Sequence, residues 1–219
     1  MNTKEHPIFI ESIKYIKSNL GCTGLDLMCQ SVLERMIHAS GDFSLQAQLN
    51  FSSGACQIGI NALKSGSDIL TDTFMAKAAI SPMAKRTLNT DVRCILECAP
   101  ETIDCESTSI TRSAIGMRNA WLKLMEKDQF LGKPIVVIGS APTALMELID
   151  LIEAGSEMPS LIVGMPVGFI GVSESKTRLL KSGIPHIVLQ GSKGGASLAA
   201  ATINSLLRGA ESELAKNTH

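Results

Sequence analysis

Among the four histidines of the chain, His38 is the one whose surroundings suit proton transfer. It stands in the stretch "ERMIHASGD", directly before a break of small residues. On a helix that turns about 100° per residue, its side chain points roughly 160° away from the apolar face, so it does not belong to the core. Imidazole exchanges a proton near neutral pH and can therefore act as an acid or a base. A solvated histidine in the last turn of a helix fits the same pattern.

Two charged residues share the helix face of His38. Glu34 precedes it by four residues and Arg35 by three, which brings both side chains within reach. The Glu34 carboxylate and the helix C-terminus would raise the pKa of His38, whereas Arg35 would lower it. The sequence leaves that balance open.

A second charged candidate is Arg112, in "SITRSAIGM". Ser109 or Thr111 can cap a helix that begins near Arg112. The helix dipole disfavours a cation at that end unless an anion is bound. The pattern fits an anion site and an ordinary surface arginine equally well.

Short apolar runs alternate with helical patterns through most of the chain. The expected strands are Asp68–Thr71, Val92–Glu97, Ile135–Ile138, Leu161–Val163 and His186–Leu189. The expected helices are Ile8–Ser18, Leu25–Ala39, Ala55–Lys64, Phe74–Ala79, Arg112–Lys127, Thr143–Glu153, Ser173–Lys181 and Ala196–Leu207. This alternation predicts an α/β fold: a doubly wound, mostly parallel five-stranded sheet with helices on both faces, in three layers. We expect one domain over residues 1–219, with a helical segment of about residues 1–66 packed on it.

The carboxyl ends of the expected strands point to a binding surface. Such sheets bind ligands beyond these ends. The segments found there are "TDTFMA", "CAPET", "GSAPTA", "GMPVGFIGVSES" and "GSKGGAS", most of them rich in glycine and hydroxyl groups. Their backbone N–H groups, with Lys176 and Lys193, suit carboxylates or phosphates.

Composition excludes several classes of protein. Of 219 residues, 45% are apolar and 4% aromatic, and the net charge is −1, so no basic field attracts nucleic acid or anionic lipid. No apolar run is long enough for a transmembrane helix, and the N-terminus lacks the apolar core of a signal peptide. We expect a cytoplasmic protein.

Standard catalytic signatures are missing as well. The chain has no P-loop, no G-x-G-x-x-G fingerprint, no G-x-S-x-G elbow and no histidine pair at metal-binding spacing. The six cysteines include no C-x-x-C, so we expect reduced thiols and no protein-bound metal.

Several motifs together resemble one family. "RMIHASGD", "TDTFMA", "ITRSA", "GSAPTAL", "GMPVGFIGVSESK" and "GSKGGASLAAATINSLL" are similar, in this order, to the precorrin-8X methylmutases of cobalamin biosynthesis. The resemblance implies a homodimeric isomerase without a cofactor. It would move a methyl group from C11 to C12 of precorrin-8X or cobalt-precorrin-8, and any cobalt would belong to the substrate.

The resemblance also assigns residues. The proposed acid–base histidine of the family corresponds to His38, and its substrate-contacting serine and arginine correspond to Ser12 and Arg35. Relatives often carry Ser-Phe where this chain has Ser12-Ile13, and some carry arginine in place of Glu11. The stretch "AKAAISPMAKRTL" is longer than the resemblance leads us to expect.

The expected substrate is a macrocycle with many carboxylates, which hydroxyl, amide and cationic groups can hold. Besides Ser12 and Arg35, the predicted substrate-binding residues are Thr71, Asp72, Thr73, Arg112, Ser113, Ser140, Ala141, Thr143, Ser175, Lys176, Lys193, Gly194 and Gly195. Two other readings stay open: a tetrapyrrole carrier without turnover, and a nucleotide-binding α/β enzyme.

Overall fold

The computed structural model describes residues 6–102, 110–125 and 132–217, and in this part the fold is a three-layer α/β/α arrangement. The strands are β1 (Leu49–Phe51), β2 (Ile69–Thr71), β3 (Val92–Cys94), β4 (Ile135–Ile138), β5 (Leu161–Gly164) and β6 (His186–Leu189). The α-helices are α1 (Pro7–Leu20), α2 (Leu27–Ser40), α3 (Ala55–Lys64), α4 (Phe74–Thr87), α5 (Arg112–Met125), α6 (Pro142–Glu153), α7 (Val172–Lys181) and α8 (Ala196–Asn217). Two short 3-10 helices are η1 (Phe43–Ala47) and η2 (Ile95–Cys98).

The sheet has six strands in the order β1-β6-β5-β4-β2-β3, and all neighbours are parallel except β1 and β6. The prediction of a mostly parallel, doubly wound sheet with helices on both faces is confirmed, but the count of five strands was wrong. The missed strand, β1, is only three half-exposed residues long, so no apolar pattern marks it. It forms because the edge of β6 offers unpaired backbone groups to an antiparallel partner.

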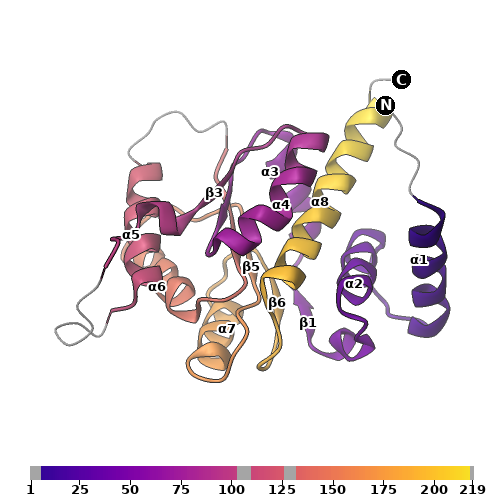
Figure 1. Ribbon diagram of the computed structural model, residues 1–219, viewed down its shortest axis with the longest axis horizontal. Helices are drawn as coiled ribbons and strands as arrows, with labels where there is room; N and C mark the ends of the chain where they lie inside the picture. The colour runs from indigo at the N-terminus through magenta and orange to yellow at the C-terminus, as the bar shows by residue number, and fades with distance from the viewer. Residues whose placement is uncertain (1–5, 103–109, 126–131, 218–219) are drawn as a thin grey trace.

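The two faces of the sheet carry separate cores. On one face Val137, Leu161 and Ile187 pack against α2, α3, α4 and α8, with α1 lying outside α2 (Figure 1). On the other face Val136 and Ile162 pack against α5, α6 and α7. Adjacent strand residues belong to opposite cores because side chains alternate along a strand.

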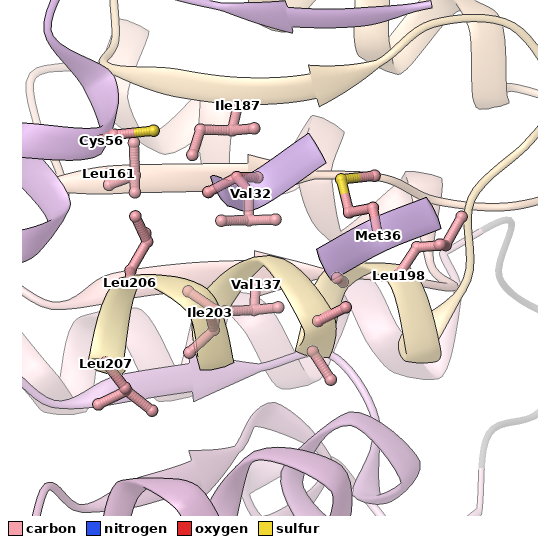
Figure 2. Packing of buried hydrophobic residues seen from close by; sticks show 14 of the residues in the cluster. Val32, Met36, Cys56, Val137, Leu161, Ile187, Leu198, Ile203, Leu206 and Leu207 are labelled. Carbon is pink, nitrogen blue, oxygen red and sulfur yellow. The ribbon is translucent and has the colours of Figure 1, made fainter. Parts of the chain in front are cut away.

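The face that carries α2 positions His38. Val32 and Met36 of α2 insert among side chains from α8 and from the strands, as Figure 2 shows. Both side chains are fully buried. Because α2 is fixed through this apolar face, its opposite face, with His38, is held toward α1.

Several boundaries differ from the prediction for local reasons. The expected strand Val92–Glu97 ends at Cys94, where its only partner, β2, also ends, and the chain turns into η2. The expected helix Phe74–Ala79 continues to Thr87 as α4, with Pro82 inside it. The stretch "AKAAISPMAKRTL", which is longer than the resemblance leads us to expect, therefore belongs to this helix up to Thr87. Asp26 accepts hydrogen bonds from the N–H groups of Met28 and Cys29, so α2 begins at Leu27 rather than Leu25.

Candidate active site

A hydrogen bond between α1 and α2 defines the centre of the candidate site. The Oγ of Ser12 lies 2.8 Å from Nδ1 of His38. Gly41, in the left-handed conformation (φ 69°), ends α2 by donating its N–H to the carbonyl of Ile37 at 2.7 Å. This cap places His38 in the last turn, where its ring reaches across to α1.

An aromatic ring and a guanidinium surround His38. The ring of Phe9, one helical turn before Ser12, meets the imidazole edge-on at 4.9 Å between centroids. The Cζ of Arg35 lies 4.8 Å from the centre of the same Phe9 ring, within cation–π distance. Sequence reasoning missed Phe9, although its spacing from Ser12 on one helix face could have found it.

Glu34 does not contribute to this centre. Its side chain is buried and accepts a hydrogen bond from Nε2 of Gln30 at 2.9 Å, and Lys17 lies 3.7 Å from its other oxygen. Burial, followed by the nearby charge of Arg35, lowers the pKa of His38 below its ordinary value. Of the opposing influences that the sequence suggested, those that lower the pKa of His38 therefore prevail.

The predicted anion site at the carboxyl ends of β2 and β4 is occupied by a carboxylate of the chain itself. Asp72 is fully buried, and its Oδ2 accepts hydrogen bonds from the N–H groups of Gly139 (3.0 Å), Ser140 (2.6 Å) and Ala141 (2.8 Å). Burial raises the pKa of Asp72, and these hydrogen bonds oppose that shift. The donors that a ligand would use at this switch point of the sheet are thus committed to the fold.

Lys176 has an internal role as well. It is 1% exposed, and its Nζ donates to the carbonyls of Gly191 (2.8 Å) and Lys193 (2.7 Å). Burial lowers its pKa to about 8. Ser175 beside it is buried and donates to the carbonyl of Val172. Lys176 thus holds the loop between β6 and α8 in place, whereas Ser175 binds within its own helix, α7.

The loop after β6 is held by contacts with parts of the chain that are distant in sequence. Gly195 donates its N–H to the carbonyl of Met165 at 2.9 Å, and a Cβ on Gly194 would stand 2.1 Å from that same oxygen. The Nζ of Lys193 binds Asp42 at 2.6 Å and Ser44 at 2.7 Å. This ion pair and hydrogen bonds from Ser44 lower the pKa of Asp42 to about 2.

The two threonines at the carboxyl end of β2, Thr71 and Thr73, also bind their own chain. Thr71 is buried and donates to the carbonyl of Arg93 at 3.0 Å. Thr73 caps α4, since its Oγ1 accepts a hydrogen bond from the N–H of Ala76.

The last group of predicted residues lies away from His38. Thr111 caps α5 through the N–H of Ala114, and its hydroxyl lies 2.6 Å from that of Thr143 on α6. Arg112 is exposed and donates to the carbonyl of Pro100 at 2.8 Å, and Ser113 is half-buried beside it. Figure 1 places α5 and α6 at the opposite end of the molecule from α1 and α2. The alternative cap, Ser109, lies outside the described residues.

The described ranges contain neither a cluster of metal-binding side chains nor a candidate membrane-spanning helix. Within residues 6–102, 110–125 and 132–217, no three His, Cys, Asp or Glu side chains gather as a metal site. Among the helices in the same ranges, none combines the length and apolarity needed to cross a bilayer.

Comparison with known proteins decides the family. The family described as precorrin-8X methylmutase matches residues 7–209. The chain belongs to the precorrin-8X methylmutase family. It is 34% identical over 205 residues to the precorrin-8X methylmutase of Pseudomonas aeruginosa, covering 91% of this chain and 93% of that one.

The other relatives agree. The cobalt-precorrin-8 methylmutase of Synechocystis sp. is 34% identical over 217 residues, covering 93% of this chain and 95% of that one. The crystal structure of the precorrin-8X methylmutase from Thermus thermophilus superposes with a TM-score of 0.82 at 32% identity, covering 95% of this chain and 99% of that one.

Within this family frame, the residues that the resemblance singled out form one group in the structure. His38, Ser12 and Arg35 meet around Phe9. Arg208 of α8, which sequence reasoning missed, joins them with its Cζ 5.4 Å from the centre of the Phe9 ring. No local motif marks Arg208, because it comes from a helix far along the chain.

Proposed function

We propose that the protein is a methylmutase that converts precorrin-8X or cobalt-precorrin-8 into hydrogenobyrinic or cobyrinic acid. A family match over residues 7–209 carries this proposal, together with a histidine that is hydrogen-bonded to Ser12 on the helix that also carries Arg35. In the reaction the C11–methyl bond breaks, a C12–methyl bond forms and the ring double bonds shift. No net oxidation occurs, so the proposal needs no redox or nucleotide cofactor.

His38 would manage the protonation state of the macrocycle. The hydroxyl of Ser12 can donate to an unprotonated Nδ1 or accept from an Nδ1–H, so it supports the ring on both sides of a proton transfer. This arrangement leaves Nε2 for the substrate. In its cationic form, His38 donates a proton to a ring carbon or nitrogen, which favours migration of the methyl group to C12, and the resulting neutral imidazole takes the proton back when the product forms.

The test is His38→Ala, assayed spectroscopically with substrate in excess over enzyme. We expect a rate loss of about a hundredfold to ten-thousandfold, the range for removing a general acid or base. Unchanged circular dichroism and melting temperature would establish that the variant is folded. Wild-type turnover by a folded variant would rule out the acid–base role.

The same assay separates an enzyme from a carrier. A carrier protein gives a spectral change that stops at one equivalent of ligand, whereas an enzyme converts many equivalents. A stoichiometric end point for the wild-type protein would overturn the proposed activity.

We also propose that the protein is a cytoplasmic homodimer, as the family resemblance implies. Two adjacent side chains in the loop after β5, Phe169 and Ile170, are each 89% exposed. Burying them against a second copy would remove apolar surface from water, which supports association. The mass of the protein in sedimentation equilibrium tests the dimer.

A further inference from the structure

Two thiols from different helices lie in direct contact. The Sγ of Cys29 on α2 lies 3.4 Å from the Sγ of Cys56 on α3, although the two residues are 27 positions apart in the sequence. Both side chains are buried, with exposed fractions of 6% and 2%. Figure 2 shows Cys56 in the same apolar core as Val32 of α2. The fold therefore brings together two groups with redox chemistry that no short motif of the sequence marks.

The first turns of two helices hold this pair in position. Cys29 is the third residue of α2, and the Oδ1 of Asp26 accepts hydrogen bonds from the N–H groups of Met28 and Cys29 at 2.9 Å each. The Oδ2 of Asp26 lies 3.3 Å from the Sγ of Cys29. Cys56 is the second residue of α3. A disulfide bond has a length of about 2.05 Å, so little more than an ångström of sulfur movement would close one.

Burial acts on this chemistry in two directions. It is the largest cause that raises the pKa of Cys29 to about 11, and it also raises the pKa of Cys56. Because the thiolate is the form that attacks an oxidant, burial makes the first step slow. A disulfide carries no charge, so burial does not oppose the product. A second thiol already in contact also traps the oxidised sulfur before it reacts further.

We propose that Cys29 and Cys56 are a site of oxidative modification, at which hydrogen peroxide closes a disulfide between α2 and α3. Cys29, the more exposed thiol, reacts first. Its thiolate attacks one peroxide oxygen, the O–O bond breaks, and a sulfenic acid and water are formed. Cys56 then attacks the sulfenic sulfur, the S–O bond breaks, and a second water leaves as the S–S bond forms. In sum, two thiols lose two hydrogens and one peroxide is reduced to two waters.

The disulfide would tie down the segment that carries His38. The stretch between the two cysteines contains the end of α2 with His38, the 3-10 helix η1 and the strand β1. Cross-linking its two ends restricts the unfolded chain, so the oxidised protein is the more stable form. In a reducing compartment the pair rests as two thiols, and the disulfide forms on exposure to peroxide. This inference does not depend on the reaction that the protein catalyses.

The test treats the full-length protein with hydrogen peroxide and then alkylates the remaining thiols. Peptide mapping by mass spectrometry without reduction should find a linked pair of peptides containing Cys29 and Cys56. The melting temperature of the oxidised protein should be higher by roughly 5–10 °C, the range for a disulfide in a domain of this size. Dithiothreitol should remove both the link and the rise.

Matched controls remove other thiols or one member of the pair. Cys22→Ser, at an exposed thiol, and Cys98→Ser, at a half-exposed one, should keep the link and the rise in melting temperature. Cys56→Ala should lose both and leave Cys29 as a sulfenic acid that dimedone labels. The mapping of the wild type does not require any variant to fold.

Two results would overturn the proposal. The first is a wild-type protein in which peroxide oxidises Cys22, whereas Cys29 and Cys56 are both recovered as free thiols. Oxidation of Cys22 shows in the same sample that the peroxide was active. The second is a linked pair without a rise in melting temperature, which would mean that the disulfide does not stabilise the segment. Both results leave the methylmutase proposal untouched, since its assay is separate.

Discussion

The surroundings of His38 and the carboxyl edge of the sheet use charge in opposite ways. At the carboxyl edge every predicted charged group is matched within the chain: Asp72 by three N–H groups, Lys176 by two carbonyls and Lys193 by Asp42. Around His38, the guanidinium groups of Arg35 and Arg208 lie over one aromatic ring, that of Phe9. Buried charges that are fully paired stabilise a particular geometry, whereas charged groups beside a reactive side chain can also act on a ligand. Removing charge should therefore harm stability in the first region and binding in the second.

The largest expected effect is at Asp72. Asp72→Ala leaves three backbone N–H groups without their acceptor, so we expect the free energy of unfolding to fall by about 3 kcal/mol or more. Urea denaturation followed by circular dichroism measures this loss. Asp72→Asn, which keeps the shape, should lose less and gives a folded sample if the alanine variant does not.

The control for Asp72 is Asp150, an exposed acidic residue on α6. Asp150→Ala removes a surface ion pair with Arg178, so its effect should stay below about 1 kcal/mol. If Asp72→Ala were no worse than Asp150→Ala, the carboxyl edge would not be the internally matched region described above.

The second expected effect is a pH dependence at Lys176. Its pKa is about 8 in the folded protein and 10.5 ordinarily, so between these values the unfolded chain binds more protons. The free energy of unfolding of the wild type should therefore rise with pH across this window, relative to Lys176→Met, by on the order of 2 kcal/mol. Urea titrations of both proteins from pH 7.5 to 10 measure the difference. Parallel curves would mean that burial does not destabilise the Lys176 charge.

The smallest effect on stability is expected at Arg35, where the consequence appears in the histidine instead. Arg35→Gln removes one of the mutually repelling charges, so the free energy of unfolding should stay within about 1 kcal/mol of the wild type. The pKa of His38 should rise, because the charge of Arg35 contributes to lowering it, but it should stay below the ordinary value of 6.5, because burial remains. NMR titration of the His38 ring measures this shift, and an unmoved midpoint would break the proposed coupling.

The two regions also differ in how far the sequence could predict them. The apolar pattern of α2 correctly turned His38 away from the core, because helical periodicity is a local property. The glycine-rich turns were correctly placed after the strands, since alternation of strands and helices fixes which ends meet. Their role as ligand donors remains a prediction, and for the turn from Gly139 to Ala141 the structure shows the donors bound to Asp72.

What the sequence alone determined, therefore, is the α/β alternation, the orientation of His38 and the family. Only the tertiary structure decided which charges are matched. Asp72 meets Gly139 across 67 positions of sequence, and Arg208 meets Phe9 from the last helix, so neither pairing has a local signature. Such contacts depend on how helices and strands pack against a shared core, and packing brings together residues whose spacing along the chain carries no information about their distance.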